Sequence, residues 1–451
     1  MKRVAIVVQR WHPDLAGGSE QHAGLYARYI ADSGVPVDLI TTTAKDAVTW
    51  QNHYDSGMTE HDGFRALRFP VAGGRRADWN ALHDLMLREA VAIRSEAFAG
   101  NLFDRDSPAI YPPKIRWPRA LQEEWIRRQG PDSPELVTYL AQKGDQYGCI
   151  IFLTYLFATC YFGSARVGPE VPTLFVPTLH DEAPAYLPAF QRMAGRFDGI
   201  LWNTEAEEQL GRSLWGPFPN KMLHRRGGMG IAMPEAEPGA LNAMPNFAGG
   251  FDPTADSFAL YCGRISLAKG CGEMIEWFLD SLDTPAELDA RDTPAARESS
   301  GEAAAKVPRK LILTGDLQME LPEHPALIYA GFVSEAQKFA LMSAARMFIM
   351  PSGFESLSVV TLEAMGQGTP VLGSDRSPVI QDHILRSGVG RMYRDRESFA
   401  SGLRVLGSCD AGESLAMQSA ARSYVADNYS HETVRERVLD AIRLLAGDSG
   451  N

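Results

Sequence analysis

Cysteine is scarce in this chain and is not arranged for disulfides or zinc. The 451 residues include five cysteines, an odd number, and no two of them have C-x-x-C spacing. This pattern argues against both a disulfide framework and a structural zinc site. We expect five buried, reduced thiols instead.

Positive charge is also in short supply. Lysine and arginine number 44 against 56 acidic residues, which gives a net charge of −12. This balance argues against a dedicated nucleic-acid-binding protein. It does not exclude contact with a membrane surface, which net charge alone cannot decide.

Long apolar runs are missing as well. The longest nearly apolar stretch covers 149–162 and has 14 residues, too few to cross a bilayer. The apolar run at 4–8 is too short for the core of a signal peptide and is better explained as a buried strand. These features predict a cytoplasmic protein.

Two common phosphate-binding motifs are absent too. No G-x-G-x-x-G follows the first predicted strand, and no G-x-x-x-x-G-K-[ST] occurs anywhere. The sequence therefore excludes the dinucleotide-binding Rossmann fingerprint and the P-loop.

The chain instead alternates short apolar runs with amphipathic segments. One amphipathic segment begins at Thr204, and Glu207 three residues later completes a helix-capping pattern. Continuous apolar runs are typical of strands covered on both faces, and their alternation with helices predicts an α/β fold with mostly parallel, doubly wound sheets. The predicted strands are 4–8, 37–42, 150–156, 172–178 and 199–203, and then 258–264, 310–315, 326–332, 347–351 and 369–374.

The composition changes at three places along the chain. A stretch rich in Pro, Gly and Ala at 232–256 is typical of an interdomain linker and predicts two lobes. Because ligands bind at the carboxyl ends of parallel strands, we expect the active site in the cleft between these lobes. Residues 100–135, rich in proline and aromatics, predict an ordered excursion near that cleft, and 283–308 predicts a flexible, partly disordered insertion.

Two motifs in the first half follow predicted strands. Gly17 and Gly18 lie between a strand and a helix, where the missing Cβ atoms and the helix N-terminus favour an anion, although a plain turn explains them equally well. His180 and Asp181 follow the strand at 172–178. A histidine there is suited to bind a substrate hydroxyl or to act in acid–base chemistry, and a structural histidine is the alternative.

In the second half, Arg264 and Lys269 follow a strand and precede a helix. Two cations at this edge of a sheet are suited to neutralise a diphosphate, with solvated surface charges as the alternative. A D-x-D motif at 104–106 has the spacing of a divalent-metal site, but it lies in the excursion and not at a strand end. We therefore expect no metal.

Two glutamates stand out in SGFESLSVVTLEAMG (352–366). Glu355 precedes a helix that we predict to begin near Ser356 or Ser358, and Glu363 lies inside that helix. Eight residues along a helix separate two side chains by about 80°. This geometry suits two contacts with one ligand better than an acid–base pair acting on one bond.

In this order, the motifs resemble those of the family-4 retaining glycosyltransferases of the GT-B fold. The resemblance rests on Arg264 and Lys269, G-F-V at 331–333, P-S-G-F-E-S at 351–356, E-A-M at 363–365 and G-x-P-V at 368–371. The Gly-Gly loop and the His-Asp pair of the first half match the same family.

The resemblance implies two Rossmann-like lobes that face each other across a cleft. Residues 1–235 would bind the acceptor, residues 236–429 the nucleotide-sugar donor, and a helix within 430–451 would cross back to the first lobe. Catalytic residues would be His180, Arg264, Lys269 and Glu355. Donor-binding residues would be Gly17, Gly18, Gly263, Phe332, Val333, Ser356, Leu357, Ser358 and Glu363, and Ser358 replaces the glycine of many members.

The implied reaction moves a sugar from a UDP- or GDP-linked donor to a hydroxyl, with retention and without a metal. The acceptor stays open between a glycan, a lipid-linked sugar and a small natural product, and Asp181, Trp125 and Arg128 are its candidate contacts. One alternative is a sugar-nucleotide epimerase of the same fold, which would need no acceptor site. Another is a two-lobed ligand-binding protein.

Overall fold

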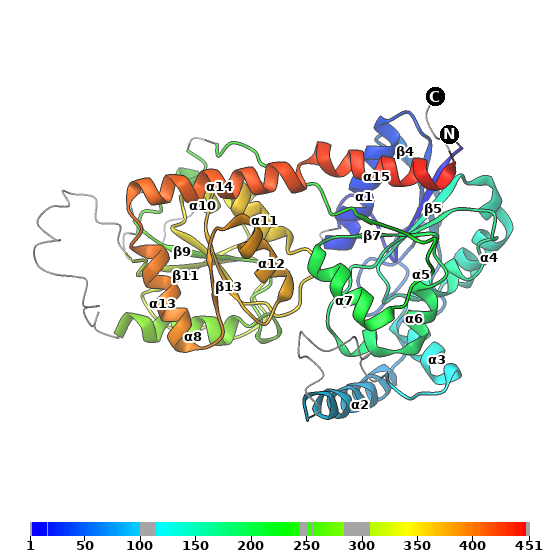
Figure 1. The fold of residues 1–451 in the computed structure, drawn as a ribbon, viewed down its shortest axis with the longest axis horizontal. Coiled ribbons are helices and arrows are strands. Elements are labelled where there is room, and N and C mark those ends of the chain that lie inside the picture. Colours follow the sequence, from blue (N-terminus) through cyan, green and yellow to red (C-terminus); the bar gives the residue numbers. More distant parts are fainter. Residues whose placement is uncertain are drawn as a thin grey trace, which may run out of the picture. The chain divides into compact units, whose positions relative to one another are not determined.

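The chain folds into two compact units, which are described separately here (Figure 1). The computed structural model describes residues 2–15, 17–99, 114–237, 239–243, 251–254, 256–283 and 307–447. Unit 1 comprises Met1–Gly230 and Glu432–Asn451, and unit 2 comprises Ile231–His431. The chain therefore leaves unit 1 near the predicted limit at 235 and returns to it near 430. The D-x-D motif at 104–106 and nearly all of the insertion at 283–308 lie outside the described residues.

Unit 1 contains one sheet with the strand order β3-β4-β2-β1-β5-β6-β7-β8. Its strands are β1 Val4–Val7, β2 Val37–Thr42, β3 Gly57–His61, β4 Phe64–Phe69, β5 Cys149–Leu153, β6 Thr173–Val176, β7 Gly199–Trp202 and β8 Leu223–Arg226. All neighbouring strands are parallel except the β3–β4 hairpin at one edge. This hairpin was not predicted, because β3 is exposed and lacks an apolar run.

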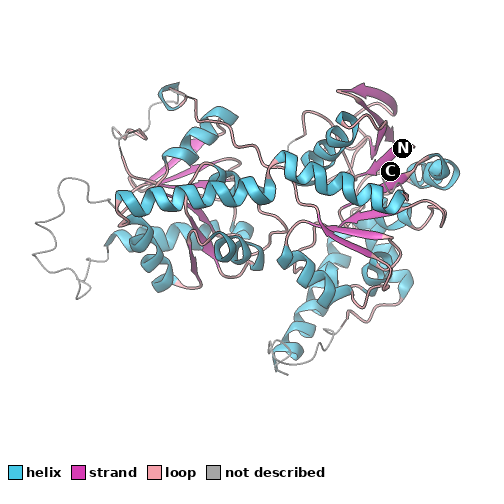
Figure 2. Ribbon diagram, turned by 45° about the horizontal axis from the view of Figure 1, so that its top comes forward, coloured by secondary structure: helices cyan, strands magenta, loops and turns pink. Residues whose placement is uncertain are grey.

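Helices cover both faces of this sheet (Figure 2). They are α1 Gly18–Asp32, α2 Trp79–Ala99, α3 Arg119–Gln129, α4 Pro134–Lys143, α5 Ala158–Ser164, α6 Pro188–Ala194, α7 Glu205–Trp215 and α15 His431–Ala446. Successive residues of β1 enter two different cores, since Ala5 packs with Trp125 and Trp202, whereas Ile6 packs with α1 and α15. Both faces of the sheet are thus buried, as the continuous apolar runs predict.

Unit 2 has a fully parallel sheet in the order β11-β10-β9-β12-β13-β14. Its strands are β9 Ala259–Cys262, β10 Leu311–Thr314, β11 Leu327–Gly331, β12 Met347–Met350, β13 Val371–Ser374 and β14 Arg391–Tyr393. Its helices are α8 Cys271–Asp283, α10 Glu335–Ala344, α11 Val359–Gly366, α12 Pro378–Ser387, α13 Arg396–Gly407 and α14 Ala411–Tyr429. Two α/β units with mainly parallel sheets confirm the predicted fold class.

The segment at 100–135 is more regular than predicted where it can be seen. Residues 119–129 form α3, and α4 begins at Pro134 with the Ser133 hydroxyl accepting a hydrogen bond from the Leu136 N–H. No helix of the described part of the chain is both long enough and apolar enough to cross a membrane.

Candidate functional site

In unit 2, a close backbone contact brings Lys269 to the loop after β12. Gly270, which follows it, has φ of 77°, a conformation that favours glycine. A Cβ atom on Gly270 would lie 2.7 Å from the carbonyl oxygen of Pro351. Because glycine lets the loops approach, Lys269 Nζ donates hydrogen bonds to Glu355 Oε1 at 2.9 Å and to Ser352 Oγ at 3.4 Å.

Arg264 lies in the same loop after β9 and is exposed. Within the described ranges its guanidinium has no hydrogen-bond or ion-pair partner, while its carbonyl accepts a hydrogen bond from the Tyr261 hydroxyl at 2.7 Å. Gly263, just before it, has φ of 144°. A hollow of about 350 Å³ adjoins this loop and is lined by Leu267, Gly270, Pro351, Phe354 and Arg376 among others. The loop after β9 thus carries two cations, Arg264 with an exposed guanidinium and Lys269 in an ion pair with Glu355 of the loop after β12.

The segment before α11 is anchored by a buried histidine that the sequence did not single out. His383 Nε2 donates to the Leu357 carbonyl at 2.8 Å, and its Nδ1 accepts from the Tyr424 hydroxyl at 2.9 Å. Burial lowers the pKa of His383 to about 4, so the ring is neutral. Ser358, the residue before the helix, has φ of 57°. The glycine that the family often carries here would adopt this conformation without strain.

Glu363 of α11 forms an ion pair with Lys338 of α10. Lys338 Nζ lies 2.9 Å from Glu363 Oε1 and also 2.9 Å from the exposed carboxylate of Glu335. Burial raises the pKa of Glu363, and the Lys338 ammonium offsets this only in part. For Lys338, burial opposes the charge, but the Glu363 and Glu335 carboxylates outweigh it and leave the pKa raised. Glu355 and Glu363 therefore belong to two separate ion pairs.

Phe332 and Val333 follow β11. The ring of Phe332 is 80% exposed. The end of the strand is fixed by Thr314, whose hydroxyl donates to the Gly331 carbonyl at 2.7 Å. The backbone of 332–333 therefore lies just after the carboxyl end of β11, one residue beyond the end of the observed strand where the sequence predicted Phe332 as its last residue.

In unit 1, a buried carboxylate anchors the loop that carries His180. Glu207 of α7 is 1% exposed, and it accepts the N–H of Leu179 at 2.6 Å and the N–H of Asn203 at 2.5 Å. Burial raises its pKa to about 8 against the opposing effect of these donors. The capping contact with Thr204 is present at 3.0 Å, but no local pattern in the sequence predicts the bond to Leu179.

His180 itself is one-third exposed. Its Nδ1 lies 3.8 Å from Glu182 Oε1, which accepts the Tyr155 hydroxyl at 2.6 Å. Asp181 accepts a hydrogen bond from the Tyr186 hydroxyl at 2.8 Å. His180 thus has a carboxylate nearby that can orient its ring, and Asp181 is held by its own unit.

Strained backbone marks the ends of two neighbouring strands of this sheet. Thr154 after β5 has φ of 66°, and Thr178 after β6 has φ of 51°. Threonine is β-branched and strongly disfavours this region, and such strain is concentrated at functional sites. The strain therefore supports a functional role for this edge of the sheet.

The two glycines at 17 and 18 differ in how closely their surroundings pack. Gly17 is extended, and a Cβ atom there would lie 2.2 Å from Glu20 Oε2. Glu20 is buried and accepts from Arg10 Nε at 2.5 Å. Gly18 has nothing within 4 Å of its Cβ position. A side chain at 17 would therefore displace the Glu20 carboxylate, whereas position 18 has open space.

Trp125 and Arg128 do not fit the predicted acceptor contacts. Trp125 is 0% exposed and belongs to the core of unit 1, because α3 packs against the sheet-covering helices. Arg128 is mostly covered, with ion pairs to Asp78 at 2.9 Å and to Glu124 at 2.8 Å. Both residues have structural roles that explain them.

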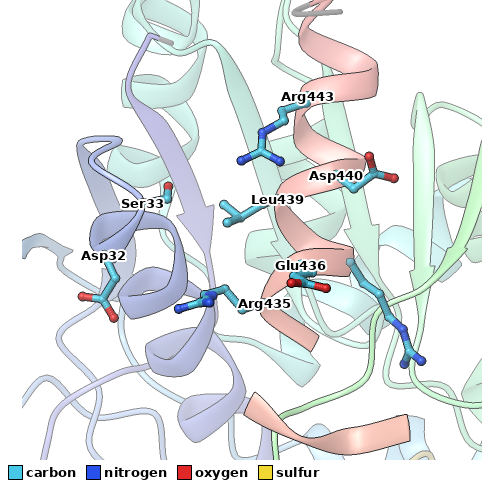
Figure 3. A pocket seen from close by; sticks show the side chains of 8 residues that line it. Asp32, Ser33, Arg435, Glu436, Leu439, Asp440 and Arg443 are labelled. Atoms are coloured by element: carbon cyan, nitrogen blue, oxygen red, sulfur yellow. The ribbon is translucent and has the colours of Figure 1, made fainter. Parts of the chain in front are cut away.

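A hollow of about 780 Å³ lies between the end of α1 and α15 (Figure 3). Side chains of both charges line it, among them Asp32, Arg435, Glu436, Asp440 and Arg443. None of the predicted site residues lines it. Among the described residues, no three or more His, Cys, Asp or Glu side chains form a group that could hold a metal ion.

Comparison with known proteins adds a domain match in unit 2. Residues 295–407 match the model of the "Glycosyl transferases group 1" family. This range includes Lys338, Glu355, Glu363 and His383. An uncharacterized glycosyltransferase of Methanocaldococcus jannaschii is 26% identical over 186 residues, which cover 40% of this chain and 44% of that protein. The match thus spans less than half of the relative's length.

Solved structures resemble the chain over its whole length. The sucrose-phosphate synthase of Thermosynechococcus elongatus covers 100% of both chains with a TM-score of 0.62 and 16% identity. The Anabaena protein HepE in complex with UDP and glucose covers 99% of this chain and 100% of its own, with a TM-score of 0.58 and 15% identity. At such identities these likenesses establish the fold. The chain therefore has the two-lobed Rossmann-like GT-B fold, and its residues 295–407 are similar to the group 1 glycosyltransferase family.

Proposed function

We propose that the protein is a retaining glycosyltransferase that moves a sugar from a nucleotide-sugar to a hydroxyl acceptor without a metal. The observation that carries this proposal is the pair of ion pairs in unit 2, Lys269–Glu355 and Lys338–Glu363. The first pair joins the loops after β9 and β12, and the second joins helices α10 and α11. All of these residues except Lys269 lie within the group 1 glycosyltransferase match. The similar structure of HepE is a complex with UDP and glucose, which supports UDP as the first donor nucleotide to test.

In this proposal unit 2 binds the donor. Arg264 and Lys269 neutralise the departing diphosphate, and the N-terminus of α11 at 356–358 adds a favourable dipole. Glu363 accepts hydrogen bonds from the ribose hydroxyls, and Glu355 contacts hydroxyls of the sugar. The backbone at 332–333 contacts the base.

The transfer breaks the bond between the sugar's anomeric carbon and the phosphate oxygen, and it forms a bond from that carbon to the acceptor oxygen. The acceptor attacks the same face, and its proton passes to the leaving phosphate oxygen. The positive charge that develops on the sugar and the negative charge on the diphosphate are stabilised by preorganised groups. His180 and the loop at 17–18 act from unit 1, with His180 binding a sugar hydroxyl.

A donor screen tests the proposal. Binding of the correct nucleotide-sugar raises Tm by mass action, and mass spectrometry then detects a glycosylated product with pooled acceptors in excess EDTA. Conversion of the donor to its epimer without any acceptor would instead establish the epimerase. Loss of transfer in EDTA would contradict the metal-independent mechanism.

Lys269→Ala is the matching variant. We expect turnover to fall about 10²–10³-fold, the usual loss when one group that stabilises the leaving charge is removed, while Tm changes little. Lys310→Ala serves as the control, because this lysine donates to the Pro325 carbonyl at the amino ends of β10 and β11, whereas Lys269 follows the carboxyl end of β9. Wild-type turnover in Lys269→Ala would refute the diphosphate role.

A further inference from the structure

A buried guanidinium without a carboxylate partner lies near the end of β4 in unit 1. Arg68 is 4% exposed, and its Nη1 donates to the Thr59 hydroxyl at 2.7 Å. Its Nε and Nη2 are buried and have no hydrogen-bond partner. Throughout the described ranges no carboxylate forms an ion pair with it. A buried charge with neither a counter-ion nor full hydrogen bonding is strongly unfavourable, so a stable fold normally supplies both.

Aromatic and imidazole rings surround this guanidinium. Its carbon lies 5.7 Å from the centre of the Tyr54 ring. The His12 ring stacks on Tyr54 with centroids 4.2 Å apart and planes at 7°, and His53 meets Tyr54 edge-on at 4.9 Å. His61 Nε2 accepts the Thr59 hydroxyl at 2.8 Å, which links it to Arg68 through Thr59. These side chains can hydrogen-bond to an anion, and three of them can carry positive charge.

The carboxylates of the neighbouring segments interact with groups other than Arg68. Asp14 lies 3.2 Å from His12 and is largely exposed. Glu20 accepts from Arg10, and Asp46 accepts the N–H groups of its own turn. The carboxylates of Asp62 and Glu60 act on His61. None of them neutralises Arg68.

Burial and mutual repulsion lower the pKa values of the cationic groups in this cluster. Burial lowers the pKa of Arg68, opposed only by the Tyr54 phenol. Burial also lowers the pKa of His12, opposed by Asp14 and assisted by Arg68, His53 and Lys45. For His61, burial and then Arg68 and His12 lower the pKa against Asp62 and Glu60. The positive charge of Arg68 thus disfavours protonation of His12 and His61. A bound anion would reduce this repulsion for all three groups.

We propose that Arg68, His12 and Tyr54 form a binding site for an oxyanion, a phosphate or carboxylate group. Arg68 lies at the carboxyl end of β4 and His12 in the loop after β1, and the carboxyl ends of strands are where α/β folds bind ligands. Arginine suits such a ligand because its planar fork donates two parallel hydrogen bonds. The free N–H groups are covered in this structure, so the anion reaches them when the partly exposed rings of His12 and Tyr54 turn aside. The proposal concerns unit 1 and is independent of sugar transfer.

Inorganic phosphate is the first probe. We expect it to raise Tm in phosphate-free, low-salt buffer and to raise the pKa values of His12 and His61 in an NMR titration. In Arg68→Met both responses disappear, and Tm without phosphate stays the same or rises, because an unpaired buried charge is replaced by an apolar side chain. A structural arginine would instead lower Tm on removal.

Arg65→Met is the matched control on the same strand. Arg65 is ion-paired with Asp38 at 2.7 Å, so its loss lowers Tm but leaves the response to phosphate intact. The proposal is overturned if the wild type does not respond to tens of millimolar phosphate, or if Arg68→Met responds as the wild type does. Comparing a hexose phosphate with inorganic phosphate then identifies the source of the oxyanion. Tighter binding of the hexose phosphate indicates a phosphorylated small molecule, and equal binding indicates the free ion.

Discussion

At the scale of single residues, Glu207 connects the stability of unit 1 to pH. Its folded pKa of about 8 lies well above its ordinary value of 4.5 because the group is buried. Between these two values the folded chain keeps a proton that the unfolded chain releases. The stabilising contribution is therefore complete below about pH 4.5 and is lost as pH rises towards 8.

This linkage predicts the behaviour of Glu207→Gln. The amide cannot accept both the Leu179 and Asn203 N–H groups, so we expect a loss of about 1–3 kcal/mol of unfolding free energy at low pH. The difference from wild type should narrow as pH rises from about 4.5 to 8, measured by urea unfolding at several pH values. Glu208→Gln is the control, because this neighbour only pairs with the exposed Arg212. A difference that is constant with pH would contradict the raised pKa.

Some residues could be predicted from the sequence and others could not, for a physical reason. Glu355, Glu363 and Arg264 stand directly beside recognisable strands and helices, so their placement follows from local patterns. Lys338 contacts Glu363, 25 residues away along the chain, and His383 contacts Leu357, 26 residues away. Such pairings arise only when helices pack, and no local spacing encodes them.

At the scale of elements, those with a clear local pattern were predicted accurately, and those that depend on packing with distant segments were not. Strands such as β2 and β12 are buried on both faces, and their apolar runs located them within a residue. The exposed β3 strand and helix α3 have mixed composition, and their structure comes from pairing and packing with neighbours. Trp125 was assigned to a ligand because an aromatic residue in an irregular segment has the same local pattern as one in a core.

The packing of α10 against α11 makes a prediction about nucleotide binding. Lys338→Met removes the cation that partly offsets the burial of Glu363, so the pKa of Glu363 should rise further. A protonated Glu363 accepts ribose hydroxyls poorly. We expect UDP affinity to fall by about tenfold or more, consistent with the loss of a hydrogen bond to a charged group, and to recover as pH rises.

Calorimetry with UDP at several pH values measures this effect. Glu335→Gln is the control, since it removes the exposed partner of Lys338 and keeps the Lys338–Glu363 pair, so affinity should stay near wild type. Equal UDP affinity in Lys338→Met and wild type at every pH would separate Glu363 from nucleotide binding.

At the scale of the whole molecule, the last helix in the sequence completes the first unit. The buried residues Val434, Val438, Ala441 and Ile442 of α15 join one apolar core with Ile6 and the buried side of α1. Unit 1 is therefore built from two segments of the chain that are separated by the whole of unit 2. The side of β1 and α1 that α15 covers cannot be buried until α15 is available.

This arrangement predicts which unit responds to a change in α15. Ile442→Ala should lower the unfolding free energy by about 2–5 kcal/mol, the usual cost of such a cavity. Hydrogen exchange should then quicken in β1, β2 and α1 while the strands of unit 2 keep their protection. Leu444→Ala on the same helix is the control, because Leu444 is half exposed and its loss should change stability by less than about 0.5 kcal/mol. Faster exchange in unit 2 with unit 1 unchanged would mean that α15 stabilises unit 2 instead. Equal losses of unfolding free energy in Ile442→Ala and Leu444→Ala would mean that burial in this core does not determine how much a residue of α15 stabilises the protein.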